Sequence, residues 1–292
     1  MDDLDVVMAE RRRLIALAYR MLGTLEEAED AVQETYLRWY RLTEEERGAI
    51  GNPQGWLTRV GSRICLDVLK SARARREQYV GEWLPEPVPA GLLGDGSAPD
   101  PVDRVTLDDT VSTALLVVLD MMTPAERVAF VLHDVFALPF PEIAEIVGRS
   151  PTAVRQLATS ARRRVADHRG IVAPPAEHDA VVRAFVAAAA GGNLDALTRL
   201  LDASVTLRSD GGGVVSAARN PVVGPTRVAR FLLGVLRKRR TWAVAVRVTA
   251  DGLGLTMTDD GEVRAVVNLR VVGGLVTDVW MVVNPGKLTG WR

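Results

Sequence analysis

The sequence predicts a multidomain protein in which two all-α domains are followed by an α+β domain. Three observations support this fold class: two segments with helical apolar spacing, a proline- and glycine-rich segment between them, and apolar–polar alternation after residue 175. A chain of 292 residues is long enough for two or three cores of ordinary size. We expect domains at 1–76, 105–170 and 175–292, with a linker at 77–104.

The composition, 48% hydrophobic and 25% charged, is typical of a folded protein and excludes wholesale disorder. No apolar run reaches the roughly 20 residues that a membrane-spanning helix needs, and the acidic start lacks the basic flank of a signal peptide. The one cysteine, Cys65, cannot form an intramolecular disulfide or a cysteine-rich zinc site. We expect a cytoplasmic protein with no membrane contact, no metal site and no cofactor.

The net charge of −1 hides an uneven distribution of charged residues. Basic residues gather at 51–80 and again between Arg149 and Arg169, and an acidic stretch at 81–125 separates the two groups. Two basic segments on one chain suggest two contacts with one polyanion. From charge alone, two solvated helix faces are the simpler interpretation.

Helix-start signals define the first domain. Thr24 and Glu27 have the spacing of a capping box, in which the threonine hydroxyl accepts from the amide three residues on. We expect a helix from Leu25 to about Tyr40, with acids in its first turns and arginines in its last. After a break at 48–53, a second helix is predicted at about 54–76.

The segment after the linker has the spacing of a helix-turn-helix. Thr123-Pro-Ala-Glu126 repeats the capping pattern and predicts a helix to about Val135. Pro141 starts a short helix that Gly148 ends, and Ser150-Pro151 starts the next one after a turn of three residues. Residue types that contact base edges and phosphates are predicted on the outward face of that helix: Thr152, Arg155, Gln156, Thr159, Arg162 and Arg163.

The region after residue 175 begins with two predicted helices, at 178–190 and 194–202. Glu262 to Val272 alternates between apolar and polar residues, which predicts a strand with one buried face and one polar face. Gly273-Gly274 turns it into a partner strand at 275–283, and Pro225 starts a further helix. Helices on one side of a curved antiparallel sheet form a cone-shaped domain that can hold a pocket.

The first two domains resemble the two conserved domains of extracytoplasmic-function (ECF) sigma factors, sigma domain 2 at 1–76 and sigma domain 4 at 105–170. Residues 28–38 are similar to the family's polymerase-clamp helix, and Asn52-Pro-Gln-Gly-Trp-Leu57 with the arginines after it looks like the promoter-melting loop and minus-ten helix. The resemblance implies core RNA polymerase and promoter DNA as partners. The implied residues are Asp30, Gln33, Glu34 and Arg38 for core polymerase; Asn52, Trp56, Arg59, Arg63, Asp67, Lys70 and Arg73 for the minus-ten element; and Arg149, Ser150, Thr152, Arg155, Gln156, Thr159, Arg162 and Arg163 for the minus-35 element.

Promoter opening also has physical requirements that these residue types meet. An unstacked base is captured on an aromatic surface, and such stacking contributes roughly 1–3 kcal/mol. Trp39 and Trp56 are candidates for this surface, and packing in the helical core is the equal alternative for each. The basic side chains would follow phosphates, which makes binding steeply dependent on salt.

Three further motifs resemble those of the ECF subgroup with a fused SnoaL-like domain. The linker has Trp83-Leu-Pro-Glu-Pro87, a loop has Asp210-Gly-Gly-Gly213, and the end of the chain has Asn284-Pro-Gly-Lys-Leu288. Val214 stands where the loop motif usually continues with lysine, and Gly286 stands where the last motif usually has an acid. Without the resemblance, the linker motif would be interpreted as a rigid spacer and the loop motif as a hairpin turn. The resemblance implies that the C-terminal domain replaces a separate anti-sigma protein by contacting the linker and the sigma domains. We expect Trp83 and Leu84 to insert against that domain, whose pocket is a candidate site for a small-molecule ligand. The implied regulatory residues are Trp83, Leu84, Pro85, Glu86, Pro87, Asp210, Gly211, Gly212, Gly213, Asn284, Pro285, Lys287 and Leu288.

Two other functions compete with this interpretation. SnoaL-like folds host cyclases and isomerases with Asp/His pairs, but no predicted strand here contains histidine, and His178 is expected before the first helix of the domain. Asp251, Asp259 and Asp260 fall in predicted turns, where solvation is the expected role. A ligand-controlled helix-turn-helix regulator would leave the clamp-like helix unexplained. We therefore expect a non-enzymatic sigma factor.

Overall fold

The computed structural model describes residues 9–77, 79–93, 112–168 and 173–291, and for 72–77 it describes the backbone alone. These residues fall into two compact units. The first unit holds the helices up to Glu77 together with Leu115–His168, and the second holds 79–92, Ser112–Ala114 and 173–291. The segment 79–92, predicted as linker, therefore belongs to the same unit as the C-terminal domain.

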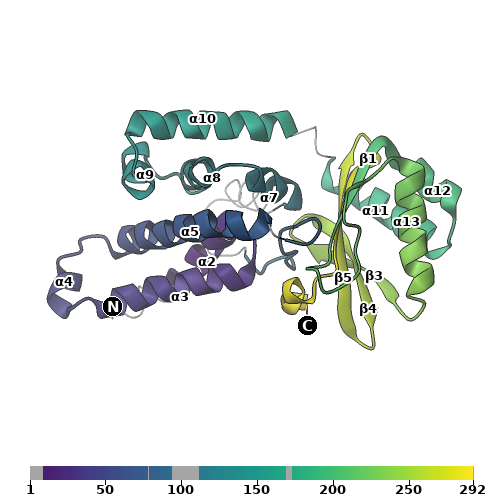
Figure 1. Cartoon of the computed structure of the whole chain (residues 1–292), viewed down its shortest axis with the longest axis horizontal. Coiled ribbons are helices and arrows are strands. Elements are labelled where there is room, and N and C mark those ends of the chain that lie inside the picture. The colour runs from purple at the N-terminus through teal and green to yellow at the C-terminus, as the bar shows by residue number, and fades with distance from the viewer. Residues whose placement is uncertain (1–8, 78, 94–111, 169–172, 292) are drawn as a thin grey trace. The chain divides into compact units, whose positions relative to one another are not determined.

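The first unit is helical throughout its described part (Figure 1). Three of its N-terminal helices, α2, α3 and α5, pack against one another, and α8, α9 and α10 do the same. The bounds are α2 (Arg11–Leu22), α3 (Leu25–Arg41), α4 (Glu44–Gly48), α5 (Pro53–Glu77), α7 (Thr113–Asp120), α8 (Pro124–Phe130) with a π-helical turn η1 (Val131–Val135), α9 (Phe140–Val147) and α10 (Pro151–His168).

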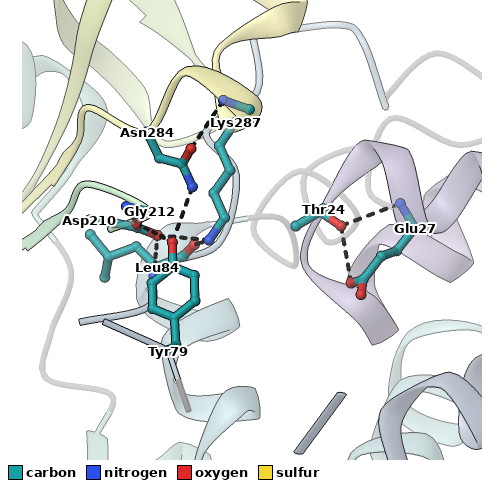
Figure 2. Close-up of polar contacts among 9 residues, drawn as sticks. Thr24, Glu27, Tyr79, Leu84, Asp210, Gly212, Asn284 and Lys287 are labelled. Carbon is teal, nitrogen blue, oxygen red and sulfur yellow. Dashed lines mark hydrogen bonds and ion pairs between the residues drawn. The ribbon is translucent and has the colours of Figure 1, made fainter. Parts of the chain in front are cut away.

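The predicted helix starts are confirmed, and each has a local cause. Thr24 Oγ1 accepts from the Glu27 amide at 3.4 Å and donates to its carboxylate at 3.1 Å (Figure 2). Thr123 and Glu126 form the complete capping box, with bonds of 3.3 and 3.0 Å. The helix predicted from Thr123 to about Val135 corresponds to two consecutive elements. It begins as α8 and continues as the π-helical turn η1, which forms its last five residues.

The second unit is a mixed sheet with helices on one face (Figure 1). Within the described residues the strand order is β2-β1-β6-β5-β4-β3. Val182, Phe185 and Leu232 from the helices share one core with strand residues such as Val267 and Val279. The bounds are α11 (Pro175–Ala190), α12 (Leu194–Arg199), α13 (Pro225–Lys238), β1 (Leu201–Asp210), β2 (Val222–Val223), β3 (Ala243–Thr249), β4 (Gly252–Asp259), β5 (Glu262–Val272) and β6 (Leu275–Val282), followed by short 3₁₀ turns at Pro285–Lys287 and Thr289–Trp291.

The α+β class of this domain is confirmed, but three details of the prediction are wrong. The sheet is not wholly antiparallel, because β1 pairs with β6 in parallel; a long connection, unlike a hairpin, allows either direction. The helix predicted at 194–202 ends at Arg199, and Leu201 already begins β1, where its side chain joins the core. His178 lies inside α11, because Pro175 takes the first helical position.

The second face of β5, predicted to be polar, is buried over part of its length. Arg264 is exposed as expected, but Asn268 is only 3% exposed and Val266 is buried. Asn268 lies against Thr113, which arrives from a distant part of the chain. Nearby, the segment 79–92 joins the end of β3 through a bridge between Pro89 and Thr249. Residues outside the domain therefore cover this side of the sheet.

No helix in the described ranges is both long and apolar enough to cross a bilayer.

Candidate nucleic-acid interface and linker-binding cluster

Helix α10 presents the residues predicted to contact the minus-35 element. Gly148 ends α9 in the left-handed conformation, with φ +71°, and Ser150 Oγ accepts from the Ala153 amide at 3.2 Å. The apolar side of α10 is buried against its neighbours, as at Val154 and Ala161. The eight predicted residues are all exposed: Arg149, Ser150, Thr152, Arg155, Gln156, Thr159, Arg162 and Arg163.

Two arginines of that face already have neighbours within the first unit. Arg162 Nε lies 2.6 Å from the Asp134 carboxylate, and the Arg155 guanidinium lies 5.5 Å from the centre of the Phe140 ring. Exposed ion pairs contribute little, typically 0–1 kcal/mol, so phosphate groups can replace them. The face is therefore accessible to a polyanion.

The start of α5 combines a structural cap with one half-buried aromatic ring. Asn52 Oδ1 accepts from the Gly55 amide at 2.9 Å, so this predicted minus-ten residue also starts the helix. The rings of Trp39 and Trp56 meet edge to face, with centroids 5.2 Å apart. Trp39 is 1% exposed and belongs to the core, whereas Trp56 is half-buried. Of the two tryptophans, Trp56 retains surface on which a base could stack.

The basic residues of α5 have contacts within the first unit. Arg59 Nη1 lies 3.3 Å from the Glu145 carboxylate, and Arg63 Nη2 donates to the Glu145 carbonyl at 3.0 Å. Lys70 lies 3.0 Å from Asp67, one turn earlier on the same helix. The side chain of Arg73 lies outside the described residues. Glu145, on α9, therefore holds two residues that were predicted to contact the minus-ten element.

Helix α3 presents the residues predicted to contact polymerase. Asp30 and Gln33 are exposed, and Glu34 is half-buried. Glu34 accepts from Arg38 Nε at 2.8 Å, an i,i+4 pair on the helix surface. The four residues thus form a mixed polar surface of two acids, an amide and a guanidinium.

A buried ion pair in the second unit binds the linker backbone (Figure 2). Asp210, fully buried at the end of β1, lies 2.7 Å from Lys287 Nζ. The Asp210 carboxylate also accepts from the Leu84 amide at 2.9 Å, and Lys287 Nζ donates to the Leu84 carbonyl at 2.5 Å. The ion pair therefore binds both polar groups of Leu84. We call this set of residues, with Tyr79, Gly212 and Asn284, the Asp210 cluster.

Further hydrogen bonds complete the Asp210 cluster. Tyr79 donates its hydroxyl proton to Asp210 at 2.5 Å, and the Gly212 amide donates at 3.0 Å. Removal from water and the adjacent carboxylate hold the pKa of Tyr79 well above its usual value, so the hydroxyl keeps its proton and remains a donor. Asn284 Nδ2 donates to the Tyr79 oxygen at 3.1 Å. Buried charges require such partners.

Two glycines of the Asp210 loop are required by close approach. A Cβ on Gly211 would lie 2.1 Å from the backbone oxygen of Val215. Gly212 has φ +65°, and a Cβ there would lie 2.6 Å from the Asn284 side chain. Gly213 is exposed, but its φ of +72° also lies in the left-handed region, so backbone conformation favours glycine at the third position as well.

The remaining motif residues differ in burial. Leu84 is 1% exposed, whereas Trp83 is half-buried and stacks its ring 4.1 Å from Lys287 Nζ. The Pro87 carbonyl accepts from Trp291 Nε1 at 2.8 Å. Tyr79 and Trp291 escaped the sequence analysis because each lies outside the motif that it contacts. Pro85, Glu86 and Leu288 are buried, and Pro285, Val214 and Gly286 are exposed.

The interpretation of Asp251 as a solvated turn residue is wrong. Its carboxylate accepts from the amide and hydroxyl of Thr113, each at 2.6 Å, and from Asn268 Nδ2 at 2.6 Å. Thr113 belongs to the same compact unit as Asp251 and Asn268, so the three side chains form one polar cluster within that unit. Enclosure of the carboxylate raises the pKa of Asp251 to about 6, because it disfavours the charged form more than the threonine bonds and the nearby His178 favour it.

This shift predicts a pH-dependent stability. A carboxyl group that binds its proton more tightly in the folded state contributes stability below about pH 4 that is lost as pH rises through about 6. We expect Asp251 to lower the free energy of unfolding by on the order of 2 kcal/mol between those limits. Urea unfolding at several pH values should show this slope in the wild type and in Asp260→Asn, a control at an exposed turn, and should show a flatter slope in Asp251→Asn. Equal slopes in wild type and Asp251→Asn would rule the assignment out.

Comparison with known proteins shows which class these features define. Residues 6–75 match the family model of Sigma-70 region 2, and residues 112–165 match that of Sigma-70, region 4. The first match covers α2, α3 and nearly all of α5, and the second covers the helix-turn-helix. Both helical parts are thus sigma-70 regions.

Relatives of similar length show which group of sigma factors the chain resembles. The chain is 40% identical to ECF RNA polymerase sigma factor SigJ of Mycobacterium tuberculosis over 97% of this chain and 92% of that protein. It is 39% identical to the probable ECF RNA polymerase sigma factor SigI of the same species, over 97% and 94%. The crystal structure of M. tuberculosis SigJ superposes with a TM-score of 0.75 at 36% identity over 99% of both chains, the α+β domain included. The chain belongs to the family of ECF sigma factors.

Proposed function

We propose that this chain directs core RNA polymerase to specific promoters through two DNA contacts, with sigma domain 2 at 1–76, a linker at 77–104, sigma domain 4 at 105–170 and a regulatory domain at 175–292. The observation that carries this proposal is that one chain exposes both the polar surface of α3 and the arginine-rich face of α10. Core polymerase and promoter DNA are cytoplasmic, so we place its action in the cytoplasm.

We propose that Asp30, Gln33, Glu34 and Arg38 bind core polymerase. Their side chains lie on one helix, and two acids with an amide suit a partner surface that offers cations and hydrogen-bond donors. Within the described chain, the ion pair formed by these four residues is the one between Glu34 and Arg38 at the helix surface, and a partner surface can exchange it at little cost.

We further propose that α10 contacts the minus-35 element and α5 the minus-ten element. For α5, the bonds of Arg59 and Arg63 to Glu145 must first be exchanged for phosphate contacts. Trp56 supplies stacking surface beside them. DNA therefore competes with α9 for the same two guanidinium groups.

We propose that the C-terminal domain modulates transcription in cis by binding the linker at the Asp210 cluster. What supports this is that the Asp210–Lys287 ion pair bonds the backbone of Leu84, so linker placement depends on it. A tethered partner reaches an effective concentration of about 1 mM, so even a modest interface is populated. A small molecule that binds this domain would act by changing the stability of the same contact.

We propose no catalytic role for the C-terminal domain. Acid–base chemistry needs a group free to exchange protons with a substrate. His178 Nε2 lies 3.1 Å from the Leu269 carbonyl, and the Asp251 carboxylate is committed to Thr113 and Asn268. The histidine and carboxylate that would form an Asp/His pair are thus engaged in structural bonds.

Run-off transcription tests the proposal. Core polymerase with the full chain is expected to initiate at the promoter, and core polymerase alone is not. A chain ending at Ala173 lacks the C-terminal domain and is expected to initiate at a rate at least about three-fold different from the full chain, since lost contacts of about 1 kcal/mol change populations by that amount or more. Equal transcript yields from the two chains would eliminate regulation in cis, and no transcript from either would eliminate the sigma activity.

A further inference from the structure

The C-terminal domain contains a basic segment that the sigma activity does not use. Residues 211–250 contain no aspartate or glutamate, although the whole chain has 37 acids and 36 bases. Such a stretch in a nearly neutral protein indicates a surface for an anionic partner. The basic residues in this stretch are Arg219, Arg227, Arg230, Arg237, Lys238, Arg239, Arg240 and Arg247.

Helix α13 gathers four of these cations on its outer face. The helix covers one face of the sheet (Figure 1), and its inner side is buried at Val228, Ala229, Leu232 and Leu233. At about 100° per residue, the direction opposite these four positions is that of Gly234. The side chains around that direction are exposed, and none forms an ion pair in the described part of the chain: Arg227, Arg230, Arg237 and Lys238.

The glycine at the centre of this face has no internal explanation. Glycine inside a helix costs about 1 kcal/mol relative to alanine. A Cβ on Gly234 would meet nothing within 4 Å, and its φ is not in the left-handed region. Neither packing nor backbone geometry therefore requires glycine here. A missing side chain between four cations leaves space for the backbone of another molecule to approach the helix closely.

We propose that Arg227, Arg230, Gly234, Arg237 and Lys238, the α13 basic face, bind the phosphate backbone of duplex DNA without sequence preference. Three of the four cations are arginines, whose planar guanidinium groups bind phosphate oxygens in pairs. The face extends about 16 Å along the helix, and a duplex carries one phosphate charge per about 1.7 Å of its axis, so several contacts are geometrically available.

Duplex DNA fits this face better than an acidic protein does. The proposal rests on the proposed function, because a chain that holds promoter DNA through α5 and α10 keeps neighbouring duplex at a high local concentration. The contact would add affinity that is sensitive to salt and indifferent to base sequence. An acidic protein would be bound by the same charges, but it would have no reason to require an empty position at Gly234.

Charge removal provides the first test. The full-length chain is titrated against a labelled 30-base-pair duplex of non-promoter sequence between 50 and 200 mM salt. Each phosphate contact contributes about −0.9 to the slope of log affinity against log salt, so Arg227→Gln with Arg230→Gln is expected to reduce the slope by about 2 and the affinity at low salt by about ten-fold. The matched control, Arg183→Gln with Arg199→Gln, removes two exposed cations from α11 and α12 and is expected to leave both unchanged.

Filling the central position provides the second test. Gly234→Leu keeps every charge and its Cβ would meet no atom within 4 Å, so the variant is expected to raise the melting temperature through better helix propensity. The same variant is expected to weaken duplex binding at least about five-fold, because the leucine side chain keeps phosphates away from the helix. A residue with only a structural role would not give higher stability together with weaker binding.

The outcomes separate this proposal from the sigma activity. Binding to core polymerase is measured without DNA. If the chain did not bind core polymerase, the sigma activity would be overturned, and the duplex titration would still test the α13 basic face independently. The proposal for α13 is overturned if the wild-type slope equals that of the Arg227/Arg230 variant, if the control pair loses as much affinity, or if Gly234→Leu binds the duplex as tightly as the wild type. If removing the four cations weakened binding to an acidic protein but left duplex binding unchanged, the partner of this face would be an acidic protein.

Discussion

Replacing Lys287 with methionine is expected to lower the free energy of unfolding of the C-terminal unit by about 3–5 kcal/mol. The substitution leaves the Asp210 carboxylate fully buried without its cation, and it removes the donor that the Leu84 carbonyl uses. Removing one partner of a buried ion pair is far more costly than removing both, because the remaining charge keeps its desolvation penalty. Urea unfolding followed by circular dichroism measures the change.

Two further variants show whether the loss comes from the ion pair. Adding Asp210→Asn to Lys287→Met removes the unpaired charge, so the double variant should be less destabilised than the sum of the two single variants, by about 2 kcal/mol. Lys238→Met makes the same chemical change at an exposed position and should alter stability by no more than about 0.5 kcal/mol. Lys287→Met with a loss below about 1 kcal/mol would show that the pair does not hold this unit together.

The same variant should also release the linker. The Leu84 amide donates to Asp210, so its hydrogen exchange reports whether the segment remains bound. In the wild type we expect strong protection of this amide, and in Lys287→Met we expect faster exchange at Leu84 than in the β5–β6 hairpin. This pattern would connect the buried pair directly to the placement of the linker.

Local signals explain why the helices could be predicted from sequence. The cap at Thr24, the proline at position 53 and the glycine at position 148 act on the next few residues only, so tertiary context does not alter them. The same holds for β5, whose alternation and Gly273-Gly274 turn gave the right strand and hairpin. The parallel pairing of β1 with β6 joins segments far apart in the chain and has no local signal.

Most members of the Asp210 cluster could be predicted from the sequence, but Tyr79 and the geometry of the cluster could not. Resemblance to a known subgroup drew attention to Leu84, Asp210 and Lys287, but no spacing rule brings together residues more than a hundred positions apart. Asp251 shows the opposite case. An aspartate in a hairpin turn normally faces water, and only the arrival of Thr113 from a distant part of the chain encloses its carboxylate.

The sequence did not show which of the helical arginines and tryptophans would contact other parts of the protein. Periodicity shows that a side chain lies on a given helix face, but it does not show what packs there. Trp39 became a core residue while Trp56 kept exposed surface, although both belong to helices of the same bundle. Arg59 and Arg63 point to a surface as predicted, and that surface is shared with Glu145.

The second large effect is expected at the α3 surface. Asp30→Lys reverses the charge of the first of the four residues proposed to bind polymerase and should weaken the complex with core polymerase at least about ten-fold, mainly through faster dissociation and loss of charge complementarity. The side chain is exposed, so the fold should be unaffected. Glu26→Lys makes the corresponding change at an exposed position in the first turn of the same helix, outside the proposed surface, and serves as the matched control.

Equilibrium binding of the purified full-length chain to core RNA polymerase, in the absence of DNA, therefore tests the account most directly. We expect a saturable one-to-one complex for the wild type and for Glu26→Lys, and a complex at least about ten-fold weaker for Asp30→Lys. A wild-type chain that is correctly folded and yet forms no complex with core polymerase would contradict the assignment.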